Sequence, residues 1–146
     1  MKKPVIVRAL IDGIFLIVIC ASVMCAQSLV SELKAEHDPG KRCEMALNFA
    51  DNAFDNARTF YVKGDIDKGD AELDNMTAVL NECVASLAAA HKAKFYKKAE
   101  MNVALLLRRM DGLLDNIDVQ QRGWAEQMQR KLEEIHDKLL DGVMRK

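Results

Sequence analysis

The chain has few of the residues that interrupt helices. Only two prolines and seven glycines occur among 146 residues, and aromatic residues make up 5% of the chain. A fold of short strands joined by turns needs more of each, so the composition argues against a β-rich architecture. Apolar residues make up 50% of the chain, which is enough for one core. We therefore expect an all-α fold of long helices.

A large excess of charge is also missing. The formal net charge is −1 at pH 7, whereas proteins that bind nucleic acids normally carry a strong basic excess. The sequence contains no Gly-x-Ser-x-Gly, no Gly-rich phosphate loop and no His-Glu-x-x-His. We expect a protein that is not an enzyme, binds no nucleic acid and works as an accessory factor through contacts with other proteins.

The start of the chain has the pattern of a secretory signal peptide. Lys2, Lys3 and Arg8 make it positive, and an apolar run over 13–26 follows. This run is shorter than the ~20 residues that a membrane-spanning helix needs. Small residues at positions 26 and 28 then provide a cleavage site before Leu29. These features predict that residues 1–28 direct export to the periplasm or secretion.

An uncleaved signal anchor in the inner membrane is the alternative for residues 1–28, and only then do we expect contact with a membrane. Residues 29–40 are expected to form a lead-in linker. They end at Asp38-Pro39-Gly40, a strong break in helical structure. Residues 41–146 are expected to form the helical domain.

Within the expected domain, apolar residues recur at steps of three and four, the spacing of helices with one buried face. The third helix is expected to reach Ile117, and Asp118, with Gln121 three residues on, is expected to cap the fourth. Four long helices with short loops predict two antiparallel hairpins in an up-down four-helix bundle. The four stripes are Cys43, Leu47, Ala50, Phe54, Ala57 and Tyr61; Ile66, Gly69, Leu73, Met76, Leu80, Cys83, Leu87 and Ala90; Ala99, Val103, Leu106, Met110, Leu113 and Ile117; and Trp124, Met128, Leu132, Ile135, Leu139 with Gly142 or Val143.

Pairing the first two stripes in antiparallel fashion predicts a disulfide. The register that sets Leu47 opposite Leu80 also sets Cys43 opposite Cys83. Removal of the signal peptide would leave only these two cysteines, and an even number in an oxidising compartment indicates a disulfide. The chain-entropy model gives about 4 kcal/mol for closing a loop of about 40 residues. Two buried free thiols are the alternative.

Charge is divided between the two predicted hairpins. Residues 36–90 hold 11 acidic and 5 basic side chains, whereas residues 91–146 hold 9 acidic and 12 basic. Either the hairpins complement each other where they pack, or the basic residues form a strip for an anionic partner such as a polymer or lipid head group. The candidate strip consists of Lys92, Lys94, Lys97, Lys98, Arg108 and Arg109.

A periplasmic haem- or metal-binding carrier is the alternative function, because four-helix bundles often hold such groups. The Cys-x-x-Cys-His motif of c-type haem is absent. A Glu-x-x-His motif occurs once, at Glu133 and His136, whereas a di-iron site needs two. Met45 or Met128 with His136 are the candidate ligands of a b-type haem, although methionines in apolar stripes usually fill gaps in a core. We expect no cofactor.

The segment Phe60-Tyr-Val-Lys-Gly-Asp-Ile-Asp-Lys-Gly69 resembles the turn of a tetratricopeptide repeat, with Ala57 and Leu73 at that family's small and large positions. The resemblance implies two antiparallel helices around residues 57–73. No second copy follows, and a single repeat cannot bury its apolar face alone. The stretch from Leu105 to Leu140 is similar to an uncharacterised exported all-helical family of bacterial proteins, and that resemblance implies no activity.

Overall fold

The computed structural model describes residues 28–90 and 93–145, and over these ranges every regular element is a helix. The fold class is therefore all-α, as predicted. The four long helices are α2 (Pro39–Lys63), α3 (Ile66–Ala90), α4 (Ala93–Leu114) and α5 (Gly123–Met144). A shorter helical segment over 28–35 precedes them. Residues 1–27 of the predicted signal peptide lie outside the described residues.

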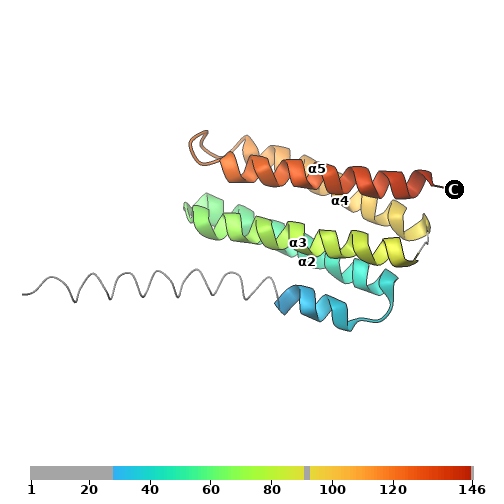
Figure 1. Cartoon of the computed structure of the whole chain (residues 1–146). Coiled ribbons are helices and arrows are strands. Elements are labelled where there is room, and N and C mark those ends of the chain that lie inside the picture. Colours follow the sequence, from blue (N-terminus) through green and yellow to red (C-terminus); the bar gives the residue numbers. More distant parts are fainter. Residues whose placement is uncertain (1–27, 91–92, 146) are drawn as a thin grey trace, which may run out of the picture.

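Figure 1 shows the four long helices lying side by side as a helical bundle. Helix α2 contacts α3 and α4, and α5 contacts the same two helices. Cys43 near the start of α2 is bonded to Cys83 near the end of α3, so these two helices are antiparallel. Tyr96 near the start of α4 contacts Gly142 near the end of α5, so these two are antiparallel as well. Within the described ranges, no helix combines the length and apolarity needed to cross a bilayer.

The two ends of α2 follow from local chemistry. The Asp38 carboxylate accepts hydrogen bonds from the backbone N–H groups of Gly40 (2.8 Å) and Lys41 (3.0 Å), so it is the N-cap. Pro39 is tolerated because the first helical N–H has no partner within the helix. The break expected at Asp38-Pro39-Gly40 is thus the start of α2. At the other end Gly64 has φ 80°, the left-handed conformation that ends many helices.

The predicted apolar stripes supply most of the core. In α2, α4 and the first turn after α4, every predicted stripe residue is buried, and so are the central residues of the stripes in α3 and α5. The end residues of these two stripes are less covered: Ile66, Ala90, Gly142 and Val143 are partly buried, and Trp124 is 38% exposed. Helices α2 and α3 also bury residues outside their stripes. These are Gly40, Ala46, Ala53, Asn75, Thr77, Val79 and Ser86.

The segment predicted as a linker over 29–40 is instead largely structured. Residues 28–35 form a helix whose Leu33 is fully buried. Figure 1 shows this helix on the face of α2 and α3 opposite to α4 and α5. The Arg42 side chain of α2 donates to the Glu36 carbonyl at 2.6 Å and lies 3.8 Å from Glu82 of α3. The linker prediction failed because one buried leucine gives too little periodicity to reveal a helix of two turns.

The connection between α4 and α5 also differs from the prediction. Helix α4 ends at Leu114 rather than at Ile117, although Ile117 is buried. Asp118 does not cap the fourth helix: its carboxylate accepts from the backbone N–H of Gln120 at 3.0 Å, inside a turn. Helix α5 begins at Gly123, and the side chain of its N-cap residue Arg122 makes no capping hydrogen bond. An aspartate in a turn satisfies a nearby N–H as readily as one at a helix start.

Candidate interaction surface

The predicted cysteine pair lies at the open end of the α2–α3 hairpin. Cys43 and Cys83 are both buried, their sulfur atoms are at bonding distance, and their Cα atoms lie 4.1 Å apart. The pairing register derived from apolar residues is therefore confirmed. The bridge joins positions 40 residues apart in the sequence, so it ties the ends of α2 and α3 that lie far from the Gly64 turn.

Two of the six predicted strip residues hold the hairpins together. The Lys98 ammonium group lies 2.7 Å from the Glu44 carboxylate of α2. The Arg109 guanidinium group pairs with both Asp51 and Asp55 of α2. It also lies over the ring of Phe54, 4.5 Å from its centroid. At these positions the basic second hairpin therefore pairs with the acidic first hairpin, as the division of charge predicted.

Three other strip residues remain available to a partner. Lys94, Lys97 and Arg108 are exposed on α4, and none forms an ion pair with a residue in the described ranges. Lys92 lies outside the described residues. The predicted strip is thus divided into a part that joins α4 to α2 and a part that faces outward.

Exposed apolar side chains lie between the outward cations. Met101 is 60% exposed and Leu105 is 52% exposed. One helical turn separates them, on the side of α4 opposite to its buried residues. We call the surface formed by Lys94, Lys97, Met101, Leu105 and Arg108 the α4 stripe. Its first turns line a shallow surface depression that Val143 of α5 also borders.

Sequence reasoning found the cations of the α4 stripe but missed Met101 and Leu105. The signal was present in the spacing. Both residues fall outside the apolar stripe of Val103 and Leu106 and on the far side of a 3.6-residue helix. Neighbouring exposed apolar residues mark a candidate interaction surface, whereas a single exposed apolar residue is ordinary.

Carboxylates border the α4 stripe on both sides. Toward α2 lie Asp51 and Asp55, which pair with Arg109. Toward α5 lies Glu100, whose carboxylate is 3.0 Å from Nε2 of His136. Asp111 lies on the same side and accepts a hydrogen bond from Gln129 of α5. The apolar and basic stripe is therefore narrow, about the width of one helix.

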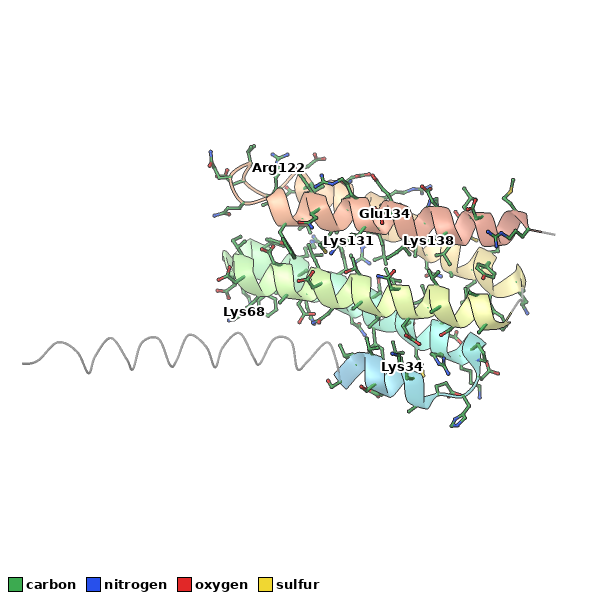
Figure 2. All side chains as sticks on the ribbon, viewed as in Figure 1. Lys34, Lys68, Arg122, Lys131, Glu134 and Lys138 are labelled. Atoms are coloured by element: carbon green, nitrogen blue, oxygen red, sulfur yellow. A yellow bond between two sulfur atoms is a disulfide. The ribbon has the colours of Figure 1, made fainter. Side chains whose placement is uncertain are left out.

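A second polar cluster lies near the Gly64 turn, and sequence reasoning did not predict it. The Tyr61 hydroxyl donates to the Asp70 carboxylate. Burial, followed by this carboxylate, raises the pKa of Tyr61 far above its usual value, and burial also raises the pKa of Asp70. Burial likewise raises the pKa of Asp74, against the opposing effects of Lys131 and Trp124. Figure 2 shows Lys131 on the side of α5 that faces α3.

The candidate ligands of the alternative carrier function do not gather at one place. Glu133 is exposed, whereas His136 contacts Glu100 of α4. Met128 is fully buried, and its sulfur lies 3.8 Å from the Thr77 hydroxyl. Across the residues that the structure describes, no three His, Cys, Asp or Glu side chains are grouped to hold a metal ion.

Comparisons with protein-family models, with curated proteins and with solved structures give no significant match.

Proposed function

We propose that the chain is an exported accessory protein that works by contact with another protein and carries out no catalysis. In this proposal residues 1–28 are a cleaved signal peptide, and α2 to α5 act as an up-down four-helix bundle in the periplasm or outside the cell. The observation that carries the export part is the Cys43–Cys83 pair at bonding distance. Disulfides persist in oxidising compartments and are rare in the cytosol.

The α4 stripe supports the part of the proposal that concerns contact with a protein. Met101 and Leu105 are both more than half exposed and lie one turn apart between cations. Neighbouring exposed apolar side chains with a polar border are typical of surfaces that bind other proteins. Lys98 and Arg109, by contrast, are already engaged with α2.

Cell fractionation, N-terminal sequencing and non-reducing mass spectrometry test the export part. We expect a periplasmic or secreted protein that begins at Leu29. Its mass should be about 2 Da below that of its reduced form, because a disulfide lacks two hydrogens. A protein that keeps Met1 and stays in the membrane fraction would support the signal anchor instead. A cytosolic protein with thiols at Cys43 and Cys83 would refute export.

Photo-crosslinking in the producing cells tests the contact part. A photoreactive residue at position 101 should give a defined crosslinked species, and one at Asn81, which is exposed on α3, serves as the matched control. Failure to crosslink from any exposed position on α2 to α5 would leave the protein without a protein partner and would contradict this part of the proposal.

A further inference from the structure

The α4 stripe combines two features that a solvated helix face does not need. Its apolar pair, Met101 and Leu105, is flanked by Lys94 and Lys97 at one end and by Arg108 at the other. Exposed cations on a helix are ordinary, and so are single exposed apolar residues. Here two neighbouring apolar residues are enclosed by cations that have no ion pair among the described residues. Such a surface favours a partner that is both apolar and acidic.

We propose that the α4 stripe docks one amphipathic helix of a partner protein, with apolar residues along its centre and acidic residues at both ends. This inference rests on the proposed function, because it names the chemistry of the partner that the contact requires. Recognition of an amphipathic helix by a facing apolar strip is a common mode of protein binding. Methionine suits such a surface because its side chain is flexible and polarizable.

The dimensions of the α4 stripe fit one helix. Lys94 and Arg108 lie fourteen positions apart, which corresponds to about 21 Å along the axis at 1.5 Å per residue. A partner helix of about four turns covers this length. Its apolar residues one turn apart would meet Met101 and Leu105, and its acidic residues would meet the cations at either end. These charge pairs would fix the position of the partner helix along the α4 stripe.

The carboxylates beside the α4 stripe argue against a flat anionic surface as the partner. A membrane of anionic lipid would extend over the neighbouring helices and approach Asp51 and Asp55 on one side and Asp111 on the other. Like charges at close range oppose binding. A single helix lies within the stripe and leaves these carboxylates in water.

A second copy of this chain is also disfavoured as the occupant. Two α4 stripes facing each other would bring Lys97 and Arg108 of one copy close to cations of the other. Such a contact needs an acidic partner at the same positions, and the stripe itself contains none. An acidic amphipathic helix supplies the opposite charge and the apolar centre together.

Binding of a synthetic peptide to the oxidised protein, purified from the compartment in which it is found, tests this inference. The probe is a fluorescent helical peptide of about 20 residues, built of Glu and Leu with the Leu residues three and four positions apart. A scrambled peptide of the same composition is the control for amphipathicity, and a version with Lys in place of Glu is the control for charge. We expect saturable binding of the first peptide only, weakened by salt.

Two double variants locate the binding surface. Met101→Gln with Leu105→Gln, and separately Lys97→Glu with Arg108→Glu, should each weaken binding of the acidic peptide by about tenfold or more. The matched control is Val62→Gln with Lys63→Glu, which changes an exposed apolar residue and an exposed cation on α2 and should leave the affinity unchanged. Circular dichroism should show the same helicity for all three double variants, since every changed side chain is exposed.

Vesicles of phosphatidylglycerol and phosphatidylcholine, together with sedimentation of the protein alone, complete the experiment. Vesicle binding that the Lys97→Glu and Arg108→Glu variant abolishes, without binding of the acidic peptide, would replace the inference with a membrane contact. Self-association that the Met101→Gln and Leu105→Gln variant abolishes would replace it with a homodimer. Absence of peptide binding would refute it, whereas the proposed function would still stand if crosslinking identified a partner elsewhere on the bundle.

Discussion

Two glycines in the second hairpin have opposite surroundings. A Cβ atom added at Gly142 of α5 would collide with the ring of Tyr96, whereas one added at Gly112 of α4 would meet no atom within 4 Å. Both glycines lie inside helices, where alanine is favoured by about 1 kcal/mol. Helices α4 and α5 are therefore in close contact at Gly142, at the end of the hairpin far from the α4–α5 connection, whereas Gly112 faces open space.

We predict that Gly112→Ala raises the free energy of unfolding by up to about 1 kcal/mol, because it improves helix propensity in open space. Gly142→Ala should lower it by about 1–3 kcal/mol, because the Tyr96 ring must move. Urea denaturation followed by circular dichroism measures both changes. Equal stabilisation by the two substitutions would show that α4 and α5 are not in close contact at Gly142.

The pair of Tyr61 and Asp70 should make stability depend on pH. Burial raises the pKa of Asp70 in the folded protein, so the folded state binds more protons than the unfolded state above the usual pKa of an aspartate. Stability from this group is fully present below the unfolded pKa and is lost as pH rises through the folded pKa. Asp70→Asn removes the charge and keeps an oxygen that accepts from Tyr61.

We predict that Asp70→Asn raises the melting temperature relative to the unchanged protein at pH 7, and that this advantage shrinks toward pH 4. Thermal unfolding at a series of pH values measures the difference. Asp115→Asn is the matched control, because the Asp115 side chain is exposed and forms no ion pair with a described residue, so its replacement should give a difference independent of pH. The same independence for Asp70→Asn would contradict the linkage.

Among the described helices, the one over 28–35 buries the fewest side chains. It is short, and its fully buried side chain is that of Leu33, with Leu29 and Val30 partly buried against the core. An isolated helix of this length is unstable in water, so its structure depends on docking to α2 and α3. The proposed cleavage before Leu29 would leave this element almost complete at the new N-terminus.

We predict that Leu33→Ala undocks the 28–35 helix and leaves α2 to α5 folded. Removal of a buried leucine side chain costs about 2–5 kcal/mol. We expect this cost to exceed the free energy that the short helix gains by docking. Hydrogen exchange should show lost protection over 30–35 and unchanged protection in α3. Lys34→Ala, which changes an exposed neighbour 4.0 Å from Glu82, should leave both unchanged. Loss of protection throughout α3 would contradict independent docking.

In the whole molecule, charged contacts add to an apolar core where the two hairpins meet. Arg109 joins α4 to Asp51 and Asp55 of α2 and lies over the Phe54 ring. Exposed ion pairs contribute up to about 1 kcal/mol each, and a cation above an aromatic ring contributes about 0.5–1 kcal/mol at an exposed site. The acidic first hairpin and the basic second hairpin thus stabilise each other at a specific place.

We predict that Arg109→Met lowers the free energy of unfolding by about 1–2 kcal/mol at low salt. High salt should reduce the difference, because it screens partly exposed charges. Denaturation at two ionic strengths measures it. Arg108→Met, one position away and without an ion pair among the described residues, should change stability little at either ionic strength. A loss for Arg109→Met that salt does not alter would assign the effect to packing.

The long helices and their buried faces could be predicted from the sequence, because burial repeats along each helix with its own period. Even the Cys43–Cys83 pairing followed, since an antiparallel register between two stripes leaves few alternatives. Secondary structure was predicted less well where a single residue carries the sequence signal. Leu33 alone did not predict the helix over 28–35. Asp118 was predicted to cap the fourth helix, whereas its carboxylate accepts a hydrogen bond inside a turn.

The candidate surface was only half predictable. Composition and periodicity predicted the all-α class, the apolar stripes of α2 to α5 and the cations on α4, because these are local properties of the chain. The packing of the helices was needed to show that Arg109 and Lys98 contact α2, while Lys97 and Arg108 enclose an exposed apolar pair. A cation's partner depends on which helix packs beside it, and that depends on the fold of the whole chain.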